Sequence, residues 1–249
     1  MATVGKNNRQ QERREQEAIR SRSESGLRRR VRVEILKTMR DMAKKFETDG
    51  DLGVDQVFQD HEKRSFELIG SYQKRVAELA GRRTAEEIDK VKKKLNDEFQ
   101  REVQDYLQND GSKNIQKVTN TTRKQVRNII ATGQLDNLSS YEIRKRIEQL
   151  SVQFSLARSA MIARTEIGIA YSKGSYAAAK TSGVSMKKEW VSAPGENARE
   201  FHQDLDGEQL EMEEYFNDGF SQLLYPRDPN ANPESIINCR CAVVYVTED

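Results

Sequence analysis

The spacing of apolar residues predicts helices along the first two-thirds of the chain. Intervals of three and four residues place apolar side chains on one face of an α-helix. Three such stripes consist of Leu27, Val31, Ile35, Met39, Met42 and Phe46, then Phe58, Ile69, Tyr72, Val76 and Leu79, then Ile88, Val91, Leu95, Phe99, Val103 and Tyr106. Turn-forming residues at 48–53, Gly81 and 109–112 separate the stripes. We therefore expect antiparallel helices joined by short turns.

The same periodicity over residues 115–130 predicts a further helix. Ser139 and Glu142 then have the spacing of a capping box, in which each residue's side chain accepts a hydrogen bond from the other's backbone N–H. This box is expected to open a short helix that ends near residue 150. A longer helix is expected over residues 155–180, and its many alanines make it a candidate for the buried centre of the fold.

Beyond residue 183 the pattern changes to short strand-like runs separated by turns. These runs cover residues 187–191, 209–212 and 242–246. All four prolines lie after residue 193, and proline in a helix interior costs about 3 kcal/mol. The expected fold class is therefore α+β, with an elongated helical N-terminal region followed by a small α+β C-terminal domain.

Residues 1–30 contain few large apolar groups and many Arg, Gln, Glu and Ser residues. Alone, such a segment cannot bury enough surface to offset the entropy lost on ordering. We expect a basic arm over residues 1–30 that is disordered or ordered by a partner. An antiparallel helical region over residues 31–111 and an α+β domain over residues 112–249 would follow it.

Charge is unevenly distributed, although the whole chain has a net charge of only +2. Residues 1–40 hold 12 Lys and Arg against 5 Asp and Glu, whereas residues 190–249 hold 3 Arg against 13 acids. Arginine neutralises phosphates without reading base sequence. The positive charge of the arm therefore predicts contact with DNA or another partner. The alternative is a solvated or partner-ordered arm that touches no nucleic acid. The candidate side chains are Arg13, Arg14, Arg20, Arg22, Arg28, Arg29, Arg30 and Arg32.

Composition and motifs argue against several classes of protein. The sequence has no run of about 18 apolar residues, so no membrane span is expected. Residues 1–16 lack the apolar core of a secretory signal, and two cysteines cannot form a disulfide framework. Gly-x-Ser-x-Gly, phosphate-binding glycine loops and His-Glu-x-x-His are missing. We expect no enzyme activity and no cofactor other than a metal ion.

Four residues of the last third have types that bind zinc: His202, Asp206, Cys239 and Cys241. A Cys-x-Cys pair with a distant His and carboxylate could close a tetrahedron. The structural alternative is that both cysteines lie on one side of a strand and pack near His202, since free cysteine is commonly a small buried hydrophobe. Either interpretation predicts that the Leu-Asp-Gly turn around Asp206 and the cysteine strand come together. A disulfide is disfavoured, because strand positions i and i+2 fit its geometry poorly.

Charged residues on the alanine-rich helix suggest an ion pair. Arg164 and Glu166 are two positions apart and cannot face each other on a helix, so each needs another partner. We expect Arg164 to form a buried ion pair with Asp206 or Asp228, which would tie the helix to the C-terminal strand.

The residues also allow two functional interpretations that differ from the resemblance described below. Arg164 with Glu211 and Glu213 is similar to the arginine and Glu-x-Glu of ADP-ribosyltransferases, although the Ser-Thr-Ser strand motif of those enzymes is missing. The first of these interpretations is an ADP-ribosyltransferase-like effector carried in the virion. The second is a generic helical DNA-binding module.

Several motifs occur together in a fixed order. After the segment 116–150 come Ile162-Ala-Arg-Thr-Glu166, Arg199-Glu-Phe-His202, Leu205-Asp-Gly207, Pro226-Arg-Asp-Pro229 and Asn238-Cys-Arg-Cys241. In order and chemistry they resemble the Mu F-like minor head (head morphogenesis) proteins of tailed bacteriophages, over about residues 112–246. Some members carry a cysteine pair just before Leu-Asp-Gly. This chain has Glu200 and His202 there, so a four-cysteine metal site is not available.

The resemblance implies a non-enzymatic minor capsid protein associated with the portal vertex. Its expected roles are head assembly and genome packaging or delivery, including DNA ejection. The implied partners are the portal protein, the major capsid or scaffolding protein, and phage DNA. The implied location is the virion, in the capsid interior at the portal vertex, after assembly in the host cytoplasm.

Overall fold

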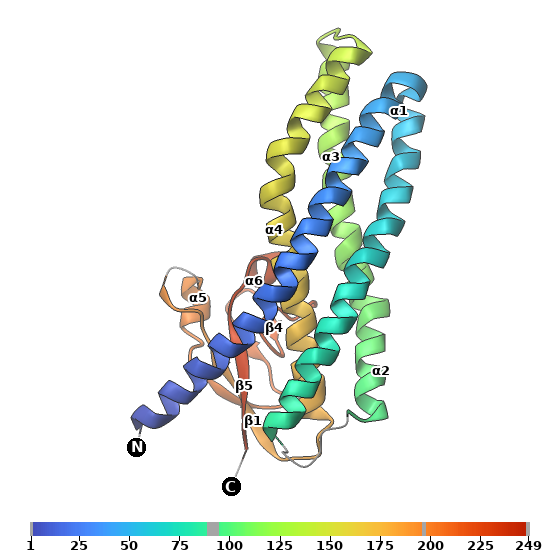
Figure 1. The fold of residues 1–249 in the computed structure, drawn as a ribbon. Helices are drawn as coiled ribbons and strands as arrows, with labels where there is room; N and C mark the ends of the chain where they lie inside the picture. Colours follow the sequence, from blue (N-terminus) through green and yellow to red (C-terminus); the bar gives the residue numbers. More distant parts are fainter. Residues whose placement is uncertain (1, 89–94, 196–197, 248–249) are drawn as a thin grey trace. The chain divides into compact units, whose positions relative to one another are not determined.

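The computed structural model describes residues 2–88, 95–195 and 198–247 (Figure 1). The chain divides into two compact units, each built from segments that are distant in sequence. The first unit comprises residues 1–24, 72–110 and 164–249, and the second comprises residues 25–71 and 111–163. This organisation differs from the three consecutive segments predicted from the sequence, because the longest helices each contribute to both units.

The second unit contains a helical hairpin within α1 (Ala2–Ile88). At Gly50 the backbone adopts φ 61° and ψ −147°, a conformation that glycine adopts at little cost. The helical segments before and after Gly50 then face each other, and Thr38 Oγ1 lies 2.9 Å from His61 Nδ1. The turn predicted over residues 48–53 is therefore confirmed.

The apolar stripes predicted from periodicity form much of the core of these helices. All six members of the first stripe, from Leu27 to Phe46, are buried. Phe58, Ile69 and Val76 of the second stripe are also buried, whereas Leu79 is exposed. The predicted end near Gly81 is wrong, since α1 continues to Ile88.

The second unit is completed by α3 (Ser112–Leu135) and the first part of α4 (Ser140–Lys180). The predicted capping box is confirmed: Ser139 N–H donates to Glu142 Oε2 at 2.8 Å, and Glu142 N–H donates to Ser139 Oγ at 3.3 Å. The break predicted near residue 150 is wrong, because α4 continues to Lys180 as one helix. No proline or glycine interrupts residues 140–167.

The break predicted at residues 109–112 is also wrong. There the chain forms a π-helical turn (Leu107–Gly111) that connects α2 (Asp97–Tyr106) directly to α3. One wider helical turn accommodates the Asn-Asp-Gly sequence without a reversal of the chain. The third predicted stripe starts late: Asn96 Oδ1 accepts from Phe99 N–H at 2.8 Å and opens α2, while Val91 lies outside the described residues.

In the first unit, the second part of α4 packs closely against the end of α1. A Cβ placed on Gly174 would lie 2.1 Å from the Ala77 carbonyl oxygen, so only glycine permits this approach of the two backbones. Ala177 and Ala178 pack there in one core cluster with Phe99 of α2. The alanine-rich helix is thus buried over this part, as the sequence predicts.

The first unit also contains an antiparallel sheet of order β2-β1-β5, formed by β1 (Met186–Val191), β2 (Gln209–Glu211) and β5 (Ala242–Thr247). Figure 1 shows β1 and β5 side by side, with Trp190 opposite Val243 in the register. Shorter elements are α5 (Glu200–Gln203), β3 (Phe216–Asn217), β4 (Gln222–Leu223) and α6 (Pro233–Ile236). The three predicted strands and the α+β class are confirmed.

The N-terminal segment was expected to be disordered or ordered by a partner; residues 2–30 are helical and have contacts within the chain itself. β5 is an edge strand, and α1 covers its outer edge with long polar side chains. Gln16 Nε2 donates to the Val243 carbonyl at 3.0 Å, and Arg9 forms an ion pair with Glu189 at 2.6 Å. The segment has few large apolar groups of its own but has hydrogen-bond partners on the sheet, which the sequence alone does not reveal.

Among the described residues, no helix has an apolar stretch long enough to cross a membrane.

Candidate metal centre

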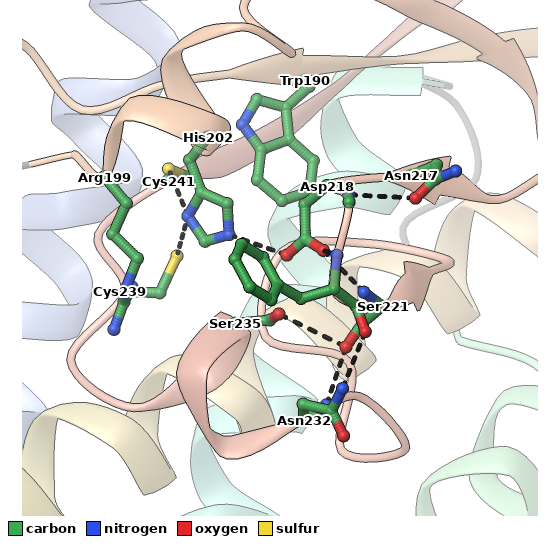
Figure 2. Close-up of polar contacts among 12 residues, drawn as sticks. Trp190, Arg199, His202, Asn217, Asp218, Ser221, Asn232, Ser235, Cys239 and Cys241 are labelled. Carbon is green, nitrogen blue, oxygen red and sulfur yellow. Dashed lines mark hydrogen bonds and ion pairs between the residues drawn. The ribbon is translucent and has the colours of Figure 1, made fainter.

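His202, Cys239 and Cys241 form a buried cluster in the first unit (Figure 2). His202 Nδ1 lies 3.7 Å from Cys239 Sγ and 3.7 Å from Cys241 Sγ. The donor atoms of the three residues all lie within 4.8 Å of one another. His202 and Cys241 are fully buried, and Cys239 is 2% exposed. The cluster is therefore a compact set of one imidazole and two sulfurs.

Short local structures bring these side chains together. His202 lies in α5, and its backbone carbonyl accepts a hydrogen bond from the Ser192 hydroxyl just after β1. Cys239 follows Asn238, which adopts a left-handed φ of 59° and turns the chain after α6. Cys241 directly precedes β5. The edge of the Trp190 ring system packs on the His202 ring, with centroids 5.1 Å apart.

Asp218 lies on the opposite side of the imidazole from the two sulfurs. Its side chain is fully buried, and Oδ2 lies 3.4 Å from His202 Nε2. Oδ1 accepts from the backbone N–H groups of Phe220 at 2.9 Å and Ser221 at 2.7 Å. Burial opposes ionisation of Asp218. The hydrogen bonds from Ser235, Phe220 and Ser221, together with His202, outweigh burial and lower the pKa of Asp218. An ionised carboxylate facing Nε2 favours the proton on that nitrogen and leaves the Nδ1 lone pair for the sulfurs.

The two thiols differ in their electrostatics. A hydrogen bond from Cys241 holds the pKa of Cys239 well below its ordinary value, helped by His202 and the charge of Arg227 against the effect of burial. The same sulfur–sulfur interaction, together with burial, raises the pKa of Cys241. Cys239 is thus the more readily ionised thiol of the pair, and a thiolate is the form that binds metals.

Asp206, the fourth predicted ligand, does not belong to this cluster. Its Oδ1 accepts from Ser192 N–H at 2.8 Å, and its Oδ2 contacts Arg9 at 3.2 Å. The Leu-Asp-Gly turn thus holds the end of β1 through Asp206. Sequence reasoning missed Asp218, since its Asp-Gly dipeptide signals a turn and gives no sign of a contact with His202.

A comparison of the sequence with models of known protein families identifies the family of this chain. The family model described as "Phage Mu protein F like protein" matches residues 120–244, half of the chain. This chain belongs to the phage Mu protein F-like family. The resemblance predicted from the motifs is therefore confirmed, and all three residues of the cluster lie within the Mu F-like region.

Two curated relatives match the chain. One is "NAD(+)--arginine ADP-ribosyltransferase EFV" of Enterococcus faecalis, 31% identical over 141 residues, which are 55% of this chain and 28% of that protein. The other is "Minor head protein GP7" of Bacillus phage SPP1, 29% identical over 121 residues, or 48% of this chain and 39% of that protein. The matches thus span less than two-fifths of either relative. No solved structure matches the chain significantly.

The predicted ion pair of the Mu F-like region is wrong. Arg164 is 29% exposed and contacts Asn238 Oδ1 at 3.0 Å and Glu24 at 3.8 Å, not Asp206 or Asp228. Glu24 lies in the early part of α1, within the segment that was expected to be disordered or ordered by a partner.

The two remaining ion-pair candidates of the Mu F-like region accept hydrogen bonds from amide N–H groups. Glu166 is buried and accepts from Gln73 Nε2 at 2.8 Å. Asp228 accepts from the backbone N–H groups of Leu224 and Asn230, each at 3.0 Å, and so closes its own loop.

The deeply buried arginine of the Mu F-like region is Arg227, which sequence reasoning did not single out. Its guanidinium donates to the Cys239 carbonyl and to Ser172 Oγ, both at 2.9 Å. A Cβ on Gly168 would lie 2.7 Å from Arg227 Cδ, so the glycine leaves room for this side chain. Arg227 therefore connects α4 to the backbone of the cluster.

The predicted basic residues N-terminal to the Mu F-like region fall into two groups. Arg13 and Arg20 are buried and take part in the fold, and Arg32 is partly buried. The exposed members are Arg14, Arg22, Arg28, Arg29 and Arg30. Only the exposed group offers its charge to an outside partner.

Proposed function

We propose that this protein acts in phage head morphogenesis as a minor head protein of the virion, associated with the portal vertex. The observation that carries the proposal is the Mu F-like match over residues 120–244. The matching minor head protein of phage SPP1 supports the same assignment. Its partners are the portal protein and other capsid components, and its action belongs to head assembly and to genome packaging or delivery.

The exposed arginines of α1 support a contact with DNA. Arg14, Arg22 and Arg28–Arg30 present guanidinium groups to solvent. Such groups neutralise backbone phosphates regardless of base sequence, and the binding weakens as salt rises. A protein inside a filled head meets DNA at every surface, so this contact suits the proposed location.

Co-purification with the cognate portal protein tests the main proposal. The full-length chain should be retained by tagged portal protein and be found in purified phage heads. A protein that is absent from heads and is not retained by the portal would overturn the assignment.

A charge-removal pair tests the DNA contact separately. Replacing Arg22, Arg29 and Arg30 by Gln should reduce retention on DNA and flatten its salt dependence. The matched control replaces the exposed Lys74, Arg82 and Arg101 by Gln, which removes the same charge elsewhere. Equal losses in both variants would show that only net charge matters and would remove the proposed arginine site.

The relative named as an ADP-ribosyltransferase favours a second candidate, an effector with that activity. The residues that suggested it have separate partners: Glu211 contacts Lys187 at 3.4 Å, Glu213 contacts Lys180 at 3.5 Å, and Arg164 contacts Asn238. We therefore favour a non-enzymatic role. Consumption of NAD by the purified chain, lost on Glu213→Gln, would reverse that preference.

A further inference from the structure

We propose that His202 Nδ1, Cys239 Sγ and Cys241 Sγ bind a Zn²⁺ ion, with Asp218 as the carboxylate that orients His202. This inference does not depend on the proposed function, since it rests only on the arrangement of these side chains (Figure 2).

The spacing of the donor atoms fits a tetrahedral zinc site. Zinc binds cysteine sulfur at about 2.3 Å and histidine nitrogen at about 2.0–2.1 Å, which puts a sulfur and a nitrogen ligand about 3.6 Å apart at the tetrahedral angle. The structure has 3.7 Å from His202 Nδ1 to each of the two sulfurs. Both distances therefore match a common ion between the three atoms.

His202 has a carboxylate partner, Asp218, of the kind that accompanies histidine ligands in zinc sites. A metal-bound histidine usually donates its other ring N–H to a carboxylate, which fixes the tautomer and the ring orientation. Here Asp218 Oδ2 faces His202 Nε2 at 3.4 Å, and within the described residues neither atom makes a regular hydrogen bond. Both side chains are almost completely buried. A zinc ion on Nδ1 would hold the remaining ring proton on Nε2, where the Asp218 carboxylate can accept it in a hydrogen bond.

The chemistry of the donors selects the metal. Two thiolates balance the charge of a divalent cation, so the ion and its two sulfur ligands together carry no net charge. Thiolate and imidazole donors favour zinc over magnesium or calcium, which prefer oxygen ligands. An iron–sulfur cluster takes four protein ligands, one more than the three that come together among the described residues.

Three protein ligands leave one corner of the tetrahedron for a water molecule. Among the described residues, no other His, Cys, Asp or Glu joins the cluster. The ion would join α5 to the segment between α6 and β5, which are separated by a long irregular stretch. Because metal binding adds to the free energy of folding, we infer that zinc stabilises the Mu F-like domain.

Metal analysis of the full chain, purified without chelator, tests the site. We expect about one zinc ion per chain, and cobalt substitution should give the absorption of tetrahedral thiolate-bound Co²⁺. Cys241→Ser should lose the ion. Asp218→Asn should keep it with an affinity lowered about 10–100-fold. Asp206→Asn is the matched control and should bind zinc normally, because Asp206 lies outside the cluster.

The unmodified chain keeps the test decisive even where a variant does not fold. If the chain retains no zinc after incubation with the ion and removal of the excess, while thiol titration finds two free cysteines, the site does not exist. A disulfide between Cys239 and Cys241 in freshly purified protein would overturn the proposal as well. Equal zinc loss in the Asp206 and Asp218 variants would refute the orienting role of Asp218.

Discussion

The Arg20 guanidinium donates a hydrogen bond to the backbone carbonyl of Cys241 at 3.2 Å, although the two residues are 221 positions apart. Arg20 is 3% exposed, and burial lowers its pKa to about 10, so it remains charged at neutral pH. The contact joins the N-terminal part of α1 to the cysteine segment, so this part of the helix belongs to the folded domain.

Arg20→Ala should therefore lower the free energy of unfolding by about 1–3 kcal/mol, since a buried carbonyl loses a charged donor. Chemical denaturation measures this change. Arg22→Ala, two positions away and exposed, is the control and should change stability by less than about 0.5 kcal/mol. Deletion of residues 1–24 should destabilise the first unit more strongly than either substitution, because it uncovers the edge of β5. A truncated chain that melts at the parent temperature would contradict the packing of α1 on the sheet.

Arg227 and Arg164 should differ sharply when truncated. Arg227→Ala removes two hydrogen bonds of a fully buried guanidinium and should cost about 3 kcal/mol. Arg164→Ala removes a partly exposed side chain and should cost about 0–1 kcal/mol. Urea unfolding measures the free energy of unfolding of both variants. A larger loss for Arg164→Ala than for Arg227→Ala would contradict the burial of Arg227.

Gly174→Ala should disrupt the contact between α4 and α1. The new Cβ would overlap the Ala77 backbone, which cannot move as a flexible side chain does, and we expect a loss of about 3 kcal/mol. Gly70→Ala is the control, since its Cβ would meet no atom within 4 Å. It should stabilise α1 by about 0.5–1 kcal/mol because alanine favours the helix. Thermal unfolding of both variants measures the contrast, and similar melting temperatures would refute the close approach.

Glu12 should make stability depend on pH. Burial, followed by the nearby Glu87 carboxylate, raises the pKa of Glu12 from 4.5 to about 8. Between these two pH values the folded state binds more protons than the unfolded state. The contribution of Glu12 to the free energy of unfolding therefore falls as pH rises from about 4.5 through 8. Glu12→Gln should lose less stability over that range than the parent protein. The exposed Glu67→Gln is the control, and an identical pH profile for all three proteins would contradict the raised pKa.

Features set by neighbouring residues could be read from the sequence. The capping box of Ser139 and Glu142, the turn at Gly50 and the stripe from Leu27 to Phe46 each depend on residues a few positions apart. Residues 1–30 were expected to be disordered or ordered by a partner, and the sequence could not show that groups such as the Val243 carbonyl, far along the same chain, provide their hydrogen bonds. Helical continuity through Gly111 escaped prediction for a related reason, since turn-forming residues also fit a π-helical turn.

The candidate site shows the same limit. Residue types alone identified His202, Cys239 and Cys241, because few side chains bind soft metals. Choosing the carboxylate was a geometric problem, and the sequence favoured Asp206 over Asp218 only through its conspicuous Leu-Asp-Gly turn. The buried arginine was expected at position 164 and lies at position 227 instead, since neither charge nor spacing shows which arginine side chain is buried.

The hydrogen bond from Gln16 to the Val243 carbonyl has a consequence for the order in which the chain folds. These residues are 227 positions apart, so the ribosome must synthesise the long stretch of chain between them before they can meet. Residues 25–163 leave the ribosome earlier and contain all segments of the second unit. The first unit therefore has the higher contact order and completes last, after translation of β5. Until β5 has been synthesised, the N-terminal part of α1 lacks the strand that it contacts in the folded protein.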